Sequence, residues 1–157
     1  TILIPAPNGL GAPHWLPDAR TALFGPGPST TQADLIRAAV EGIAFLMKDI
    51  VEAMRGTDRI RIDSLSAAGG GSRVNALIQA QADCLGIPIR RSSSFEATGL
   101  GAALLAGVGC GWWPSPPETV HATEGRVFRP RISKAERDRR YSRWKRAIEA
   151  VRKFYGE

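Results

Sequence analysis

The sequence feature that most constrains the fold is a run of three glycines between two segments of different periodicity. Residues 64–68 form a short, mostly apolar stretch that predicts a strand, and Gly69, Gly70 and Gly71 follow it directly. Residues 72–85 then place apolar side chains at helical spacing until Gly86, so we expect a helix there that Ser72 caps. Because a strand, a glycine turn and a helix in this order are typical of α/β domains, the feature predicts an α/β fold.

The flanking segments continue this pattern. Residues 59–68 predict a strand in two halves, residues 87–90 a second strand, and residues 97–110 a helix whose glycines imply close packing or an approaching ligand. Thr31 and Asp34 form a capping-box start for a helix over 31–55, and Gly56 with residues 57–58 ends it. Residues 1–30 hold six of the eleven prolines and predict one short strand and an ordered loop. The apolar side chains expected at helical spacing along 31–55 are Ile36, Val40, Ile43, Met47, Ile50 and Met54.

The positive charge of the chain is confined to its last segment. Residues 131–157 carry ten basic and four acidic side chains, a balance that equals the whole net charge of +6, while residues 1–130 are neutral. Ser133 and Glu136 form a second capping box, and one apolar stripe follows. We therefore expect a docked helix with a solvated outer face rather than a nucleic-acid site, with a non-enzymatic binding module as the alternative. The stripe consists of Tyr141, Trp144, Ile148, Val151 and Tyr155.

The histidines and cysteines show no metal-site or disulfide spacing. His14 and His121 lie far apart, so we expect packing roles and no zinc site. Cys84 falls on the inner face of a predicted helix, where a small apolar role is expected. Cys110 is the other cysteine, and without a CxxC motif or a secretory leader the pair favours a reducing cytoplasm. No apolar run approaches the roughly 20 residues that a membrane helix needs.

The carboxylates give no acid/base pair by spacing. Asp18, Asp63 and Asp83 stand singly in the sequence. Glu96 precedes the glycine-rich helix over 97–110, where a negative charge favours the helix dipole, and we prefer that interpretation to a catalytic role. No catalytic residue is therefore assigned from the sequence.

The triple glycine is the candidate ligand site. Adjacent glycines let a ligand approach the main chain, and the free N–H groups at the start of the next helix attract an anion or the polar edge of a nucleotide. The alternative is a tight strand-to-helix turn, and the glycines alone do not separate the two. No Gly-Lys-Ser/Thr follows, which excludes a P-loop, and Val74 stands where the dinucleotide fingerprint needs a third glycine.

Several motifs in a fixed order give residues 9–150 a resemblance to the FGGY carbohydrate kinases. The triple glycine is one of them, and residues 128–130 (FRP) and 141–147 (YSRWKRA) are similar to the end of the glycerol kinases in this family. The other motifs are residues 9–15 (GLGAPHW), 18–20 (DAR), 24–25 (FG), 36–44 (IRAAVEGIA), 81–83 (QAD), 85–88 (LGIP) and 96–103 (EATGLGAA).

The resemblance implies an actin-like (ribonuclease H-like) ATPase domain, here its C-terminal, nucleotide-side portion. It implies a kinase that uses ATP and Mg²⁺ to phosphorylate a polyol or sugar, most simply glycerol, with a pentulose or another sugar as the alternative. The nucleotide-binding residues it implies are Gly69, Gly70, Gly71 and Asn75, although Ala68 and Val74 replace the Asp and Asn usual in glycerol kinases.

The resemblance also implies a larger protein. In this family the catalytic aspartate and the phosphate-binding loop belong to segments that precede the equivalent of Thr1, so we expect a fragment with no catalytic residue and no kinase activity of its own. The expected organisation is one partial domain with a strand and loop (1–30), an α/β core (31–130) and a basic C-terminal helix (131–157). Its expected partners are an N-terminal kinase domain, ATP and the small substrate, with neither nucleic acid nor membrane. An unpaired sheet edge leaves a homo-oligomer open.

Overall fold

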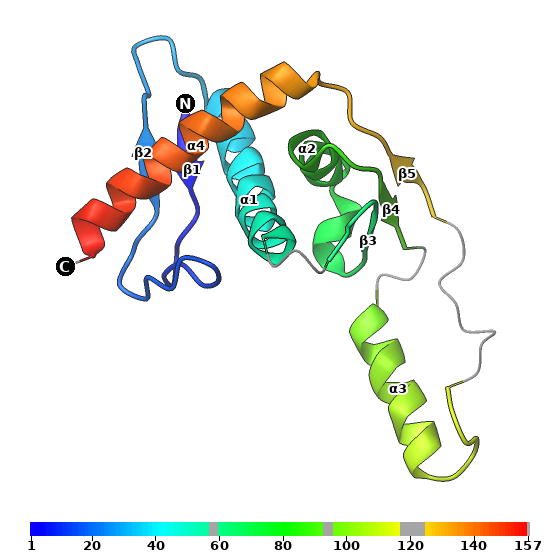
Figure 1. Ribbon diagram of the computed structural model, residues 1–157. Coiled ribbons are helices and arrows are strands. Elements are labelled where there is room, and N and C mark those ends of the chain that lie inside the picture. Colours follow the sequence, from blue (N-terminus) through cyan, green and yellow to red (C-terminus); the bar gives the residue numbers. More distant parts are fainter. Residues whose placement is uncertain (57–59, 93–95, 117–124, 157) are drawn as a thin grey trace.

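The computed structural model describes residues 1–56, 60–92, 96–116 and 125–156. The helix end and strand start expected at residues 57–59 and the packing role expected of His121 fall outside these ranges. The elements are β1 (Ile2–Ile4), β2 (Ala22–Phe24), α1 (Gln32–Arg55), β3 (Leu65–Ala67), the 3₁₀ helix η1 (Gly70–Arg73), α2 (Asn75–Leu85), β4 (Ile89–Arg91), α3 (Ala97–Gly109), β5 (Val127–Phe128) and α4 (Lys134–Tyr155) (Figure 1).

Two small sheets organise the described part of the chain. β3 and β4 run parallel and are joined through α2, which confirms the α/β unit expected around the triple glycine. β5 adds to β4 in the antiparallel direction, and β1 pairs with β2 in a separate antiparallel sheet. The sequence predicted neither β2 nor β5. In Figure 1, α4 crosses α1 and the β1–β2 sheet, while α3 projects away from the other helices.

The strand expected over residues 59–68 is shorter than predicted. Residues 60–63 are not in a strand, and only Leu65–Ala67 pairs with β4. The Arg55 guanidinium donates to the carbonyl of Ile62 at 3.0 Å, and Arg61 pairs with Asp63 at 2.8 Å. Residues 61–63 are thus held by side-chain contacts and do not pair with another strand. The predicted first half of the strand is therefore wrong.

The long helix α1 begins as its capping signal predicts. The Thr31 hydroxyl accepts from the Asp34 N–H at 3.3 Å, and the Asp34 carboxylate accepts from the Thr31 N–H at 3.0 Å. The apolar stripe, however, is largely exposed, since 59% of Ile36 is accessible to solvent. The buried face is set by Gly42, where a Cβ would overlap the carbonyl of Leu3 in β1, so only a small residue lets the strand approach. The buried residues of α1 are Ala38, Gly42, Ala44, Phe45, Lys48, Asp49 and Val51.

Close packing holds one of the four glycines of α3. A Cβ at Gly107 would overlap the indole ring of Trp113, so the turn after the helix folds back onto a bare backbone position. At Gly99, Gly101 and Gly109 no neighbouring group lies within 4 Å of the Cβ position. The expectation of close packing is thus confirmed at Gly107 alone.

The basic helix α4 is docked through its apolar stripe, as predicted. Trp144 is fully buried, and its ring stacks on Phe45 of α1 with the centroids 5.3 Å apart. Ile148 and Val151 are buried in the same core. The Ser133 hydroxyl accepts from the Glu136 N–H at 3.2 Å, which caps the helix. The outer face carries basic side chains and the ion pairs of residues 134–140.

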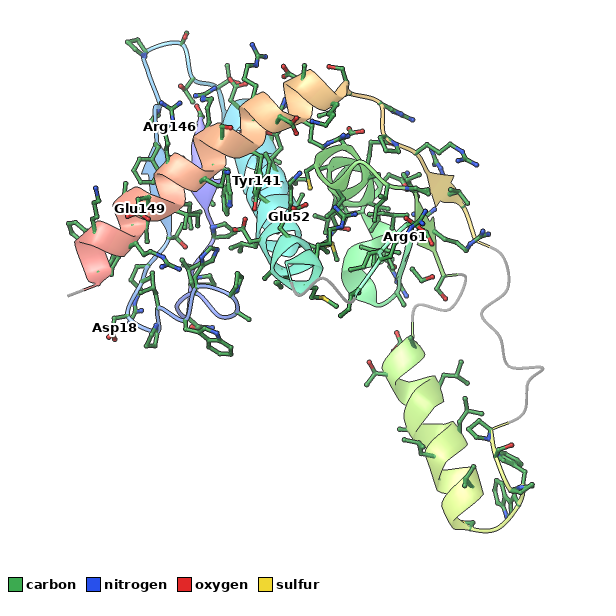
Figure 2. All side chains as sticks on the ribbon, in the orientation of Figure 1. Asp18, Glu52, Arg61, Tyr141, Arg146 and Glu149 are labelled. Carbon is green, nitrogen blue, oxygen red and sulfur yellow. The ribbon has the colours of Figure 1, made fainter. Side chains whose placement is uncertain are left out.

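A buried carboxylate joins three segments at this interface. Asp49 of α1 is 6% exposed, and its carboxylate accepts from the Tyr141 hydroxyl and from the Trp144 indole N–H, both at 2.7 Å. His14 Nε2, from the loop after β1, lies 2.8 Å from the same carboxylate. Figure 2 shows Tyr141 on the face of α4 that looks toward α1. His14 thus has the loop-packing role expected of it.

Removing this carboxylate should destabilise the protein strongly. We expect Asp49→Ala to lower the free energy of unfolding by about 2–4 kcal/mol, because it leaves the Tyr141 and Trp144 donors buried without an acceptor. Urea denaturation followed by tryptophan fluorescence measures the change. Asp18→Ala, at an exposed loop position, is the matched control and should stay within about 0.5 kcal/mol of the parent. Equal stability of the two variants would contradict the role of Asp49.

A second polar contact crosses the α1–α2 interface. The Lys48 ammonium donates to the carbonyl of Cys84 at 2.8 Å, and burial lowers the pKa of this lysine. The Cys84 thiol donates to the carbonyl of Ala44, and its burial raises the pKa of the thiol to about 12. Cys84 is therefore an inert core residue, as predicted, whereas Cys110 is exposed.

The raised pKa of Cys84 predicts an alkaline loss of stability. Between the ordinary value of 9.0 and about 12, the unfolded chain releases the thiol proton while the folded chain keeps it. This residue therefore contributes a fall of up to about 1.4 kcal/mol in unfolding free energy per pH unit. In denaturation series at pH 8–11, Cys84→Ala should show a shallower decline than the parent, and Cys110→Ala should match the parent. An unchanged slope in Cys84→Ala would refute the prediction.

Candidate functional site

The turn after β3 requires glycine at its first position. Gly69 has a φ of +86° and a ψ of 177°, a backbone region that only glycine adopts readily. This conformation turns the chain out of β3 and directly into η1. The first glycine of the triple is thus explained by backbone geometry.

The other two glycines leave the main chain uncovered. No atom lies within 4 Å of the Cβ position at Gly70, and at Gly71 the one neighbour is a methyl group of Leu77 at 3.7 Å. Packing within the described residues therefore does not demand glycine at either place. Bare backbone on an open side favours the approach of a ligand over the alternative of a tight turn.

The N-terminus of α2 has no side-chain cap. Its N-cap is Val74, which has no acceptor, so no side chain caps the first-turn N–H groups. Ser72, expected as this cap, lies inside η1 instead, where its hydroxyl donates to the carbonyl of Gly69 at 2.7 Å. That expectation is wrong because the chain makes a 3₁₀ turn before the α-helix begins. The uncapped N–H groups and the helix dipole together favour an anion at this end of α2.

An arginine that the sequence analysis missed supports the loop. Arg91 of β4 donates to Asn75 Oδ1 at 2.7 Å and to the carbonyl of Ser72 at 3.3 Å, and its guanidinium lies over the Phe128 ring. It links the glycine loop, the start of α2 and β5, and brings a positive charge to the anion-attracting end of the helix. The register pairs Arg91 with Ala67, the last residue of β3, so a parallel β3–β4 alignment could have revealed it.

The remaining candidate residues have other environments. Asp63 pairs with Arg61, Asp83 accepts from the Arg131 N–H at 2.7 Å, and Asp18 is exposed. Glu96 occupies the N-cap of α3, where its side chain caps no N–H group. Within the described ranges, no three His, Cys, Asp or Glu side chains are grouped so as to hold a metal ion, and no helix is long and apolar enough to cross a membrane.

The geometry of the turn predicts different losses of stability when its first two glycines are replaced by alanine. Gly69→Ala should cost about 1–3 kcal/mol of unfolding free energy, because alanine strains the backbone at this φ and ψ. Gly70→Ala, one residue later and facing open space, is the matched control and should change stability by less than about 1 kcal/mol. Thermal and urea unfolding of both variants measures the difference. A neutral Gly69→Ala would contradict the observed conformation.

Known proteins resemble this chain along almost its whole length. The model for the FGGY family of carbohydrate kinases, C-terminal domain, matches residues 1–110. Glycerol kinase of Lactobacillus acidophilus is 42% identical over 99% of the chain, and glycerol kinase of Myxococcus xanthus is 44% identical over 94% of it.

Solved structures show the same relationship. The crystal structure of Plasmodium falciparum glycerol kinase with ADP superimposes with a TM-score of 0.80 at 31% identity, covering 96% of the chain. Xylulose kinase of Lactobacillus acidophilus shares the fold, with a TM-score of 0.75 at 22% identity and 99% coverage. The chain spans 31% and 30% of the two curated glycerol kinases and 30% and 32% of the two solved structures, about a third of the length in each case.

Proposed function

Because this chain belongs to the FGGY family of carbohydrate kinases and has the α/β architecture of that family's actin-like ATPase fold, we propose that it provides the nucleotide side of an ATP-dependent carbohydrate kinase. The intact protein would transfer the γ-phosphate of ATP to a hydroxyl of a polyol or sugar. The open backbone at Gly70 and Gly71, beside the uncapped start of α2, is the observation that carries this proposal.

The proposed nucleotide contacts are Gly69, Gly70, Gly71 and Asn75. The glycines let the flat edge of a base or ribose lie against the main chain, and the first turn of α2 supplies N–H donors. Arg91 holds Asn75 through its side-chain oxygen, which leaves the Asn75 amide group to donate. The solved glycerol kinase with ADP supports a nucleotide in proteins of this fold.

Glycerol is the proposed substrate. The curated relatives at 42% and 44% identity are glycerol kinases, which favours glycerol over the pentulose alternative. The likeness to xylulose kinase, at 22% identity, supports the fold alone. We therefore propose glycerol phosphorylation, giving glycerol 3-phosphate, as the activity of the intact enzyme.

The metal and the reacting groups are proposed to lie elsewhere in the intact enzyme. Phosphoryl transfer needs Mg²⁺ on the phosphates and a base for the attacking hydroxyl. The described residues group no set of ligands for a metal, and the family match is to a C-terminal domain. We propose that an N-terminal kinase domain supplies both, that residues 1–30, 31–130 and 131–157 act together as one partial domain, and that the protein works in the cytoplasm.

Nucleotide binding tests this proposal. ATP added to ¹⁵N-labelled protein should shift the amide signals of Gly69–Asn75 and Arg91, with weak affinity, and Gly70→Val should abolish these shifts by covering the open backbone. Gly27→Val is the control, because Gly27 also faces open space but lies before α1, far from the turn in sequence.

The same samples test the expected division of labour. We expect no ATP-dependent phosphorylation of glycerol or a pentulose by residues 1–157 alone, because the described residues bring no catalytic carboxylate to the loop. ATP shifts confined to α4, or equal in the parent and Gly70→Val, would overturn the nucleotide site. Turnover by the isolated chain would overturn the assignment of the chemistry to another domain.

A further inference from the structure

The contact between Arg91 and Asn75 fixes which way the Asn75 amide faces. Asn75 Oδ1 lies 2.7 Å from Nη1 of Arg91. Because a guanidinium donates hydrogen bonds and has no acceptor, the atom of the amide that faces Arg91 must be the oxygen. The amide nitrogen therefore points away from Arg91, and a ligand that meets this side of Asn75 meets a hydrogen-bond donor.

The Arg91 side chain is itself held from several sides. Its Nη1 also donates to the Ser72 carbonyl at 3.3 Å, and its guanidinium lies 5.4 Å from the centre of the buried Phe128 ring. The main-chain N–H of Arg91 donates to the Arg126 carbonyl at 2.9 Å. A hydrogen bond from a charged donor is roughly twice as strong as a neutral one, so turning the Asn75 amide over would break a strong contact.

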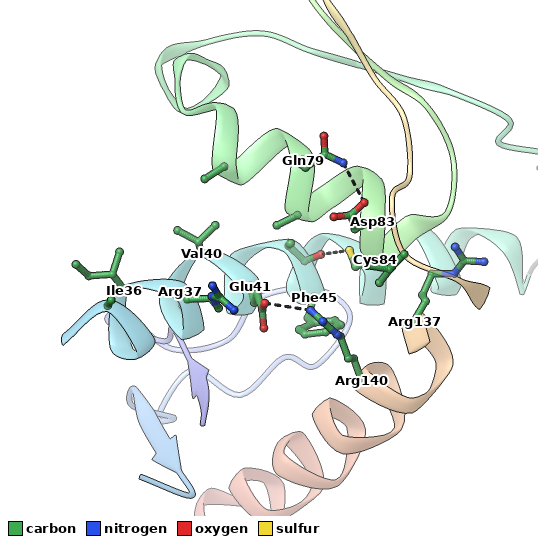
Figure 3. A pocket seen from close by; sticks show the side chains of 15 residues that line it. Ile36, Arg37, Val40, Glu41, Phe45, Gln79, Asp83, Cys84, Arg137 and Arg140 are labelled. Carbon is green, nitrogen blue, oxygen red and sulfur yellow. Dashed lines mark hydrogen bonds and ion pairs between the residues drawn. The ribbon is translucent and has the colours of Figure 1, made fainter. Parts of the chain in front are cut away.

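The helix that carries Asn75 is anchored on the same side of the sheet as Arg91. The Gln79 amide donates to the Arg129 carbonyl at 2.9 Å, and the Asp83 carboxylate accepts from the Arg131 N–H at 2.7 Å. Figure 3 shows Gln79 and Asp83 joined to each other on α2, where both line the pocket between α1, α2 and α4. These contacts tie α2 to the segment that follows β5. The positions of Asn75 and Arg91 relative to each other are thus set by the fold around them.

The other possible acceptors beside Asn75 are already engaged. The Val74 side chain has no polar atom, and the Val74 carbonyl accepts from two N–H groups of α2, at 3.0 and 3.3 Å. The Gly69 carbonyl accepts from the N–H and the hydroxyl of Ser72, at 3.1 and 2.7 Å. The Gly71 carbonyl accepts from the Val74 N–H at 3.2 Å. An amino group of a base therefore finds no free side-chain acceptor at these residues.

Donors, by contrast, are available at the same place. Among the described residues, no hydrogen bond engages the main-chain N–H groups of Asn75 and Ala76 in the first turn of α2. The ring nitrogens of a purine are acceptors, whereas the 6-amino group of adenine is a donor. An asparagine usually recognises adenine by using its oxygen and its nitrogen together, on the 6-amino group and N7. Asn75 cannot make this paired contact, because Arg91 occupies its oxygen.

We propose that Arg91 fixes Asn75 as a donor to the purine ring nitrogens, so that the site takes purine nucleotides without selecting the 6-amino group of adenine. Arg91 acts through Asn75 and is a positioning residue. The inference rests on the proposed nucleotide side of the kinase and adds its base selectivity. A nucleotide with a 6-oxo group, such as inosine diphosphate (IDP), is therefore bound as well as ADP.

Titration of ¹⁵N-labelled residues 1–157 with ADP and with IDP tests the proposal, because the two bases differ in the group at position 6. The dissociation constants should agree within threefold, and the Asn75 side-chain amide signals should shift with both ligands. In Arg91→Met the Asn75 oxygen is released and can accept from the 6-amino group. This variant should therefore prefer ADP to IDP by at least fivefold.

A matched variant separates this effect from the loss of an arginine charge. Arg61→Met removes an exposed arginine that pairs with Asp63 before β3, and it should keep the affinities and the ratio of the parent. The decisive quantity is a ratio of two ligands on one variant, so a partly unfolded population lowers both affinities without changing it. If circular dichroism shows that Arg91→Met is unfolded, Asn75→Ala at the exposed start of α2 decides the outcome. It should weaken ADP and IDP by the same factor, at least threefold.

The possible failures have distinct meanings. A preference of more than threefold for either nucleotide in the parent, or a ratio below fivefold in Arg91→Met, would overturn the role of Arg91. So would an Asn75→Ala variant that binds both ligands as the parent does or that loses more affinity for ADP than for IDP. If neither nucleotide shifts the signals of residues 69–75, the nucleotide site itself is wrong and this inference falls with it.

Discussion

The carboxylate of Asp49 is the interaction on which the arrangement of this chain depends. It is buried between α1 and α4 and accepts hydrogen bonds from two α4 side chains, while His14 reaches it from the loop after β1. A buried carboxylate is tolerated only when its oxygens are satisfied, so the three segments must dock in one relative position. The apolar stripe of α4 supplies the burial, and Asp49 sets where along α1 that stripe lies. The basic charge of the last segment is therefore carried by a helix whose inner face is already occupied.

The glycine loop depends on a different kind of constraint. Gly69 takes a conformation closed to other residues, and Arg91 reaches from β4 to hold Ser72 and Asn75. The loop therefore keeps its shape through one backbone turn and one side chain, while Gly70 and Gly71 stay bare. The loop is held in one shape while its main chain stays accessible, and a site that binds through main-chain groups needs both properties. Both depend on the parallel pairing of β3 and β4, because that pairing brings Arg91 beside the end of β3.

Local signals predicted the parts of the fold that local contacts determine. The capping box of Thr31 and Asp34 and the left-handed glycine at Gly86 mark helix ends through contacts within a few residues, and both are confirmed. The sequence did not predict β2 and β5, because strands of two or three residues form only by pairing with a strand that is distant in sequence. Of the site, the glycines were found from their spacing. Arg91 was not, since its role depends on a strand register that the sequence does not display.

The exposed stripe of α1 shows most clearly how a distant contact overrides an amphipathic pattern. By spacing alone, Ile36 and the apolar residues that follow it should face the core. Instead the face with Gly42 docks, because β1 can approach only where α1 has no side chain, and Lys48 and Asp49 are buried with it. Both polar groups can be buried because both are hydrogen-bonded, Lys48 to the Cys84 carbonyl of α2 and Asp49 to the Trp144 indole of α4. Rotating α1 in this way turns Ile36 and Val40 outward beside the alanines of α2. The exposure of Ile36 thus accompanies the close contact that seats β1 on Gly42.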